Sequence, residues 1–302
     1  MLTDIYVIDY VLKDLEGAKD RLDRIFGTEP LWLDPEMVPG AEFTAMYYQL
    51  PGNGERSHAL GLFQSGSGAI ECDTDRVFLI GIMCDDLPAT MREIADRGLT
   101  FLHDEPERYA VGESNTLGAL HGLEIFIARH DPGGDRKARE MMFTKDGSSD
   151  FGDETQGGLL RGVVGIDLVV NDFEAAVDTY RKVFGAQPAD TTKRTGEAGI
   201  VSAHFAAPGG GRGIREMGIF AVDRSQTPGP FAERLSGILR QRGEGVFRID
   251  FLVTDLAAMQ AKFAERGLCP TDGDALVFED INGADLRFVA ERARAEPGRV
   301  EG

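Results

Sequence analysis

The chain has 302 residues, 42% of them hydrophobic and 27% charged, which is typical of a water-soluble globular protein with room for two domain cores. Lys and Arg number 32 against 51 Asp and Glu, and the net charge of −19 predicts repulsion from nucleic-acid phosphates and anionic lipids. The N-terminal residues show no signal-peptide pattern and the three cysteines no CxxC spacing, so we expect a cytoplasmic protein without a disulfide framework, and neither nucleic acid nor membrane among its partners.

The first predicted elements are a strand that begins at Val7 and a helix that follows it. Asp14 stands at the N-cap position of this helix, apolar residues recur behind it at helical spacing, and Gly27 stands where a left-handed C-cap is expected. Further strands are expected over residues 42–50 and 58–64, because both runs are apolar and a Pro-Gly-Asn-Gly turn separates them.

The same strand-helix pattern then returns along the chain, which indicates an internal repeat. A second copy has its N-cap at Asp86 and ends in Arg97-Gly98-Leu99, and that ending recurs 169 positions later in Arg266-Gly267-Leu268. A third copy matches the first at positions 158 residues apart, where Asp9, Asp14, Phe26 and Gly27 recur as Asp167, Asp172, Phe184 and Gly185. With Asp255 as the last N-cap, the chain therefore contains four copies of one unit.

A polar and glycine-rich stretch separates the first two copies from the last two. It has almost no large apolar residues, as expected of a linker. We therefore predict an N-terminal domain over residues 1–143, a linker over 144–158, a C-terminal domain over 159–291 and a frayed tail over 292–302.

The repeated order of strand, Asp-Leu-Glu or Asp-Phe-Glu, helix and Phe-Gly resembles the module of the vicinal oxygen chelate superfamily, which includes glyoxalases, bleomycin-resistance proteins and extradiol dioxygenases. Its clearest copy runs from Val169 to Ala186, and the resemblance covers nearly the whole chain apart from the linker and the tail. It implies an α+β fold of four βαβββ modules paired into two glyoxalase-like domains. Each domain would be a curved mixed sheet around a cavity with its helices outside, as in the extradiol dioxygenases.

The resemblance also implies where a metal would be held, because dioxygenases of this family bind iron through two histidines and a glutamate. The matching positions here carry no such ligand: they are Val7, Leu79 and Phe126 in the first domain and Gly165, Arg248 and Arg287 in the second. We therefore expect no cofactor. One alternative stays open, a divalent metal held by a displaced set of ligands, Asp167, His204, Glu216 and Asp250.

Strand alternation predicts which side chains of the second domain face its cavity. The apolar residues of each strand should lie under the helices, which turns the polar ones inward. The inward set is Asp167, His204, Arg248, Asp250, Asp285 and Arg287. The equivalent positions of the first domain are mostly apolar, so we expect the second domain to be functional and the first to be a scaffold or a degenerate copy.

This inward set predicts an acid-base site. Asp167 and Asp250 occupy equivalent strand positions, and neighbouring carboxylates raise one pKa toward the range of a general acid or base, while His204 is suited to move a proton. Arg248 and Arg287, with Asp285, are expected to bind substrate. A structural alternative remains open for each of them: hydrogen bonds between strands for the carboxylates, a satisfied histidine, and ion pairs of the arginines with Asp250 and Asp285.

Three functions are compatible with this pattern. The preferred one is an enzyme of the lyase or isomerase type that acts on a small anionic or aromatic molecule by metal-independent acid-base chemistry. The second is a non-catalytic binding protein of the bleomycin-resistance type, and the third is a metal-dependent dioxygenase or lyase with displaced ligands. The expected partner is a small molecule, and exposed edge strands also make a homodimer possible.

Overall fold

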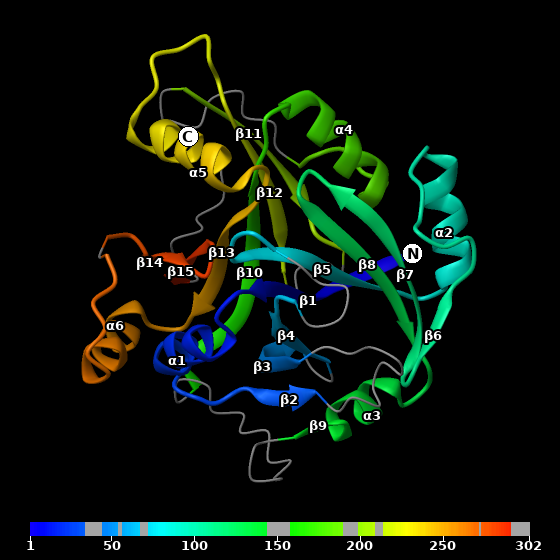
Figure 1. The fold of residues 1–302 in the computed structure, drawn as a ribbon, viewed down its shortest axis with the longest axis horizontal. Helices are drawn as coiled ribbons and strands as arrows, with labels where there is room; N and C mark the ends of the chain where they lie inside the picture. The colour runs from blue at the N-terminus through cyan, green and yellow to red at the C-terminus, as the bar shows by residue number, and fades with distance from the viewer. Residues whose placement is uncertain are drawn as a thin grey trace, which may run out of the picture.

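The computed structural model describes residues 1–33, 44–53, 56–66, 72–143, 158–189, 199–208, 214–271 and 273–290. The chain forms two mixed β-sheets with helices packed against them, so the predicted α+β class is confirmed (Figure 1). The predicted tail and nearly all of the predicted linker lie outside the described residues.

The first sheet contains two complete βαβββ units, which meet through the antiparallel pair β1–β5. Its nine strands lie in the order β6-β7-β8-β5-β1-β4-β3-β2-β9. Its helices are α1 (Leu15–Phe26), α2 (Leu87–Asp96) and α3 (Gly134–Glu140). The strands are β1 (Leu2–Leu12), β2 (Leu31–Leu33), β3 (Ala45–Asn53), β4 (Arg56–Gln64), β5 (Arg76–Cys84), β6 (Glu107–Tyr109), β7 (Gly112–Leu120), β8 (Leu123–His130) and β9 (Met142–Phe143).

The second sheet is built in the same way around the antiparallel pair β10–β13, and its order is β11-β12-β10-β13-β15-β14. Within the described residues each of its two units has two strands after the repeat helix, where the predicted βαβββ module has three. Its helices are α4 (Phe173–Phe184), α5 (Pro230–Arg242) and α6 (Leu256–Glu265), of which α5 falls between two units and is an element that the repeat does not predict. The strands are β10 (Leu160–Val169), β11 (Ile200–Ala206), β12 (Glu216–Val222), β13 (Gly245–Val253), β14 (Leu276–Ile281) and β15 (Ala284–Ala290).

The repeated aspartates cap the helices as predicted. The carboxylates of Asp14, Asp86, Asp172 and Asp255 each accept the backbone N–H three residues on, at 2.9 to 3.0 Å, which satisfies a donor that the helix itself leaves unpaired. The predicted left-handed C-caps are confirmed at Gly27 and Gly185, whose φ angles are 67° and 66°.

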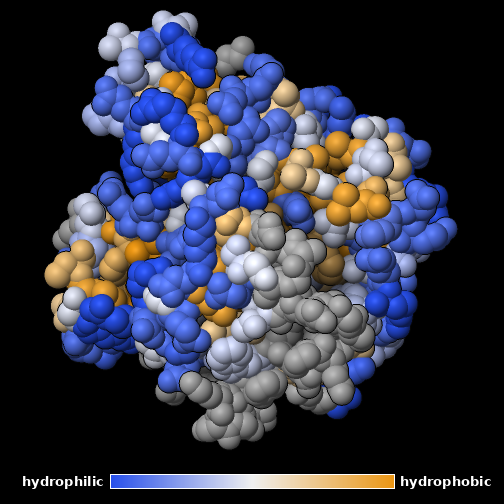
Figure 2. Space-filling model, viewed as in Figure 1, coloured by the Kyte–Doolittle hydropathy of each residue, from blue (hydrophilic) through white to orange (hydrophobic). Residues whose placement is uncertain are grey.

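One hydrophobic core joins the two halves of the molecule. A single cluster of buried side chains contains residues of both sheets and of α1, α2, α4 and α6. The rings of Phe26 in α1 and Phe251 in β13 lie 5.5 Å apart within it. The visible surface is mostly hydrophilic, with apolar residues in small separate areas (Figure 2). Among the described residues, none of the helices has the length and apolar character needed to cross a bilayer.

The Arg-Gly-Leu copies of the repeat tie the halves together. Arg266, which follows α6, donates to the carbonyl oxygens of Arg24 and Ile25 at the end of α1, at 3.3 and 3.2 Å. Arg97, which follows α2, donates in the same way to Lys182 and Val183 at the end of α4. Each guanidinium therefore satisfies helix-end carbonyls of the other half, where a positive charge is favoured.

Candidate functional site

The predicted alternation of the second sheet is confirmed by the side chains around each helix. Ile166, Leu168, Ile249, Phe251 and Phe288 lie in the core beneath α4 and α6. The opposite side, which we call the inner face, therefore carries the remaining residues of the same strands. Helix α5 packs on part of this inner face, where its Ala232 and Leu235 form a separate cluster with Val169, Ile200, Phe220 and Phe247.

A chain of ion pairs crosses the inner face from β10 through β13 to β15. Arg248 Nε lies 2.7 Å from Oδ2 of Asp167 and 3.6 Å from Oδ1 of Asp250. Arg287 Nε donates to Oδ1 of the same Asp250 at 2.9 Å, and its Nη2 contacts the other oxygen. Four of the six residues predicted to line the cavity thus form one connected group, which we call the ion-pair chain.

Strand register explains why these four residues meet. In the antiparallel pair β10–β13, Asp167 stands opposite Arg248, and in the parallel pair β13–β15, Asp250 stands beside Arg287. Side chains opposite each other on one face of a sheet are close enough to bond. Gly218 on β12 makes room for the group, because a Cβ atom there would lie 2.1 Å from Oδ1 of Asp167.

Asp285 is held differently from the ion-pair chain. Both of its carboxylate oxygens accept from Arg234 of α5, at 2.5 Å each, and the backbone N–H of Asp280 donates to Oδ1 at 3.0 Å. Arg234 was not identified from the sequence, because it lies on a helix that the repeat does not contain. The bidentate pair joins α5 to β15 and fixes the helix over the inner face.

Burial and charge act in opposite directions on the guanidinium of Arg248. Burial lowers its pKa, but the carboxylates of Asp167 and Asp250 outweigh this and hold the pKa above its ordinary value. Its Cζ also lies 5.4 Å from the ring centre of Phe247 and 5.5 Å from that of Phe220, which adds cation–π attraction. Arg248 is therefore a permanently charged group with partners on every side.

His204 lies on the same face but outside the ion-pair chain. It stands opposite Gly218 on β12, which separates it from Asp167 by one strand. Its Nδ1 is 4.0 Å from Oε1 of Glu216, and its ring meets that of Phe220 edge-on at 5.5 Å. The side chains of His204 and Glu216 are 27% and 36% exposed, so both can reach a bound molecule.

The residues of this face do not fit a divalent metal. Arg248 and Arg287 stand at two of the positions where the resemblance implies metal ligands, and a guanidinium group repels a cation. Of the displaced set, Asp167 and Asp250 already bind Arg248, and His204 and Glu216 lie apart from them. Within the part of the chain that the structure describes, no group of three or more His, Cys, Asp or Glu side chains is placed to hold a metal ion.

The first sheet carries an unpaired copy of the same aspartate. Asp9 corresponds to Asp167, and it likewise leans over a glycine, Gly61, whose Cβ would lie 2.1 Å from Oδ1. Leu79 stands where the second domain has Arg248. Oδ1 of Asp9 consequently has no hydrogen-bond partner among the described residues, and burial raises the pKa of this carboxyl well above its ordinary value.

Comparison with known proteins supports the resemblance. The family model described as Glyoxalase/Bleomycin resistance protein/Dioxygenase superfamily matches residues 162–288. Among curated protein sequences, none matches the chain significantly.

Solved structures match over almost the entire chain at low identity. A triple mutant of 4-hydroxymandelate synthase from Streptomyces coelicolor is 14% identical with a TM-score of 0.68, over 96% of this chain and 92% of that one. A Mn(II)-bound glyoxalase from Novosphingobium aromaticivorans is 14% identical with a TM-score of 0.56, over 96% and 82%. A trihydroxybiphenyl dioxygenase from Sphingomonas wittichii is 12% identical with a TM-score of 0.52, over 95% and 91%. Residues 162–288 therefore match the glyoxalase/bleomycin resistance protein/dioxygenase superfamily, and the chain as a whole shares the fold of these solved structures.

Proposed function

We propose that the inner face of the second sheet binds a small anionic molecule, aliphatic or aromatic, without a metal ion. The observation that carries this proposal is the presence of Arg248 and Arg287 where relatives of this fold would hold a metal. Arginine presents a planar set of donors that matches a carboxylate, so the site chemistry becomes that of anion recognition.

Arg287 is the group that would receive the ligand. Arg248 contacts two carboxylates and its side chain is 17% exposed. Arg287 pairs with Asp250 alone among the described residues, and its side chain is 30% exposed. A ligand carboxylate can approach the side of the Arg287 guanidinium that faces away from Asp250, while Asp250 accepts from Nε and Nη2. We assign to Asp167 and Asp250 the role of orienting the two guanidinium groups. Arg248 lies between the two carboxylates, and its positive charge allows both to be ionised without sharing a proton.

The finer part of the proposal is acid-base chemistry of the lyase or isomerase type. His204 is the group we expect to move a proton on the bound molecule, and Glu216, 4.0 Å away, is placed to orient its ring. The alternative is a protein that binds the same molecule without changing it, because every carboxylate of the ion-pair chain already has a cationic partner.

A ligand screen tests the binding proposal. Aliphatic and aromatic carboxylates would be screened by thermal shift on chelator-treated protein, and the affinity of each hit measured by calorimetry. Arg287→Gln should weaken a genuine hit about tenfold or more, the value of a charge-assisted hydrogen bond. The control is Arg108→Gln, which removes the same charge from an exposed position of the first sheet. Equal binding by Arg287→Gln and the wild type would refute the assignment.

The same hits separate catalysis from sequestration. Each would be incubated with the protein and followed by NMR for chemical change. Conversion that is abolished by His204→Gln while binding persists supports the acid-base role of His204. Hits that bind and remain unchanged favour the sequestration alternative.

A further inference from the structure

The two halves of the molecule meet at two equivalent junctions. At one of them the turn between β7 and β8 docks against α4 and the segment before β13, and Gly122 allows the close approach because a Cβ there would lie 1.9 Å from the carbonyl oxygen of Glu244. At the other junction the turn between β14 and β15 docks against α1 and the segment before β5. Gly283 allows this close approach, because a Cβ there would lie 2.2 Å from the carbonyl oxygen of Asp75. Corresponding residues at these junctions occupy corresponding places in the repeat.

The first junction is closed by internal hydrogen bonds. Nδ1 of His121 lies 2.9 Å from Oε2 of Glu244, and its Nε2 lies 3.3 Å from Oγ1 of Thr179. The other oxygen of Glu244 accepts the backbone N–H of Asn171 at 2.6 Å. The histidine ring thus joins α4 to the segment before β13, and both of its nitrogen atoms have partners.

The second junction begins in the same way but is not completed. The backbone N–H of Lys13 donates to Asp75 at 2.8 Å, as Asn171 does to Glu244. Asn282, which replaces His121, accepts from Nε and Nη2 of Arg21 at 3.1 and 2.7 Å. Its own Nδ2 donor has no partner among the described residues, although the side chain is only 5% exposed. A buried donor without an acceptor is costly.

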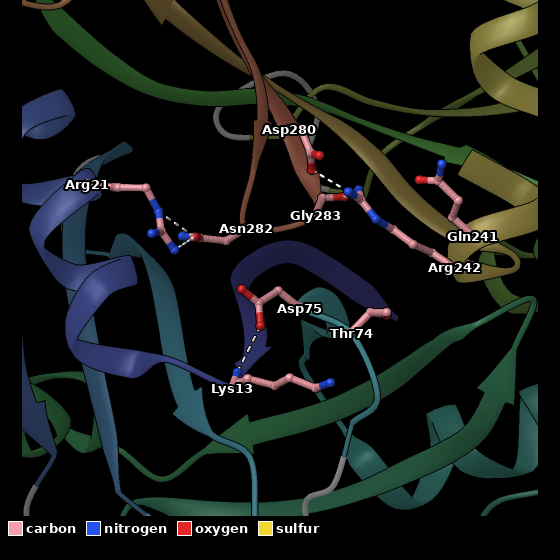
Figure 3. Close-up of a pocket in the computed structure, with 9 residues that line it drawn as sticks. All are labelled: Lys13, Arg21, Thr74, Asp75, Gln241, Arg242, Asp280, Asn282 and Gly283. Carbon is pink, nitrogen blue, oxygen red and sulfur yellow. Dashed lines mark hydrogen bonds and ion pairs between the residues drawn. The ribbon is translucent and has the colours of Figure 1, made fainter. Parts of the chain in front are cut away.

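An open cavity of about 650 Å³ occupies this second junction (Figure 3). Arg21 and Arg242 reach the β14–β15 turn from opposite sides, and Lys13 lies below it. Arg242 donates to the carbonyl oxygen of Gly283 at 3.0 Å and to Asp280 at 2.5 Å. The volume is in the range of small-molecule sites. The full lining is Lys13, Arg21, Thr74, Asp75, Gln241, Arg242, Asp280, Asn282 and Gly283.

The charge of this cavity is opposite in sign to that of the protein. Three cationic side chains line it against two carboxylates, in a chain with a net charge of −19. Arg21 bonds to a neutral amide, and the Lys13 ammonium has no hydrogen bond or ion pair within the described residues. Two of the three cations therefore lack a carboxylate partner, and the groups available to a ligand are donors.

We propose that this junction is a second ligand site, distinct from the inner face of the second sheet, which binds a small molecule through a phosphate or carboxylate group. The anion bridges the Lys13 ammonium and the Arg21 and Arg242 guanidiniums, and it offers an acceptor to the Nδ2 donor of Asn282, which has no partner among the described residues. Lys13 and Arg21 belong to the first half of the chain and Arg242 to the second, so the ligand links the halves.

Calorimetric titration with inorganic phosphate and with citrate, at constant low ionic strength, tests the proposal. At least one of the two anions should bind saturably, and the preferred one identifies the acceptor group as phosphate or carboxylate. Lys13→Gln should weaken binding about tenfold, because it removes a charge that makes no bond within the described residues and so leaves the fold intact. Lys262→Gln, on α6 and outside the lining of the cavity, is the control and should leave binding within about twofold of wild type.

Two results would overturn this site. One is the absence of saturable binding of either anion at millimolar concentration. The other is binding that Lys13→Gln and Lys262→Gln change equally, which would reduce the effect to net charge. Arg287→Gln should leave phosphate or citrate binding at this junction unchanged, so failure here and failure of the inner-face proposal are separate outcomes.

Discussion

Arg248 binds Asp167 across the two central strands of the second sheet, with Nε 2.7 Å from Oδ2. The corresponding pair in the first sheet is Leu79 and Asp9, which cannot form such a bond. Leu79 in place of Arg248, together with Phe126 in place of Arg287, thus separates an isolated buried carboxyl from a connected polar face.

Arg248→Met should be strongly destabilising. It leaves Asp167 and Asp250, whose side chains are 5% and 3% exposed, without their shared cation. Breaking a buried ion pair from one side costs about 3–5 kcal/mol in the free energy of unfolding. Urea unfolding of this variant and of the double variant Asp167→Asn/Arg248→Met would measure the coupling. The double variant should be the more stable of the two, and a strictly additive loss would contradict the pairing.

Asp9→Asn should change how stability depends on pH. Burial raises the pKa of Asp9 in the folded protein, so the folded state keeps a proton that the unfolded chain loses above about pH 4. Stability due to this group is therefore full below the unfolded pKa and falls as pH rises toward the folded pKa, by about 1.4 kcal/mol per pH unit at most. The variant should gain stability relative to wild type between pH 4 and pH 8.

The control for that experiment is Asp104→Asn, which removes one exposed charge from the same half of the chain. The free energy of unfolding of this variant should change with pH in the same way as that of the wild type over the same pH range. If the stability of Asp9→Asn also had the same pH dependence as that of the wild type, Asp9 would be ionised in the folded state. The description of Asp9 as an unpaired, protonated carboxyl would then be wrong.

Arg234→Met should loosen α5. The substitution removes the bidentate bond to Asp285 and leaves the hydrophobic contacts of Ala232 and Leu235 in place. Hydrogen exchange of the backbone amides over residues 230–242 should speed up while α6 stays protected. Unchanged protection of α5 would show that its apolar contacts alone hold it on the inner face.

Arg97→Ala and Arg266→Ala should each weaken the attachment between the halves. Each variant exposes two helix-end carbonyls that a guanidinium of the other half now satisfies, worth about 1–2 kcal/mol in the free energy of unfolding. Because the two sites are far apart, the losses should add in the double variant. Losses below about 0.5 kcal/mol would mean that water replaces the arginine at no cost.

The repeat made much of the fold predictable. Capping aspartates, closing glycines and the alternation of each strand are local signals, and they located the helices and the inner face without any long-range information. Helix α5 was missed because it belongs to no copy of the repeat. The roles of Arg97 and Arg266 were also missed, since a contact between halves leaves no local pattern.

The site was predictable in part for the same reason. Alternation placed Asp167, Arg248, Asp250 and Arg287 on one face, but which carboxylate pairs with which arginine depends on strand register. Asp285 turned out to bind Arg234, whose position depends on α5. The contrast between Leu79 and Arg248 was visible in the sequence and could have indicated that Asp9 lacks a partner, but that prediction was not made.

The most direct test of the central claim is the affinity of chelator-treated protein for its best carboxylate ligand, measured with and without added Mn(II) for the wild type and for Arg287→Gln. Metal-independent anion binding predicts one affinity for the wild type under both conditions and a loss of about tenfold in Arg287→Gln. Binding that requires the added metal, or that survives Arg287→Gln unchanged, would contradict it.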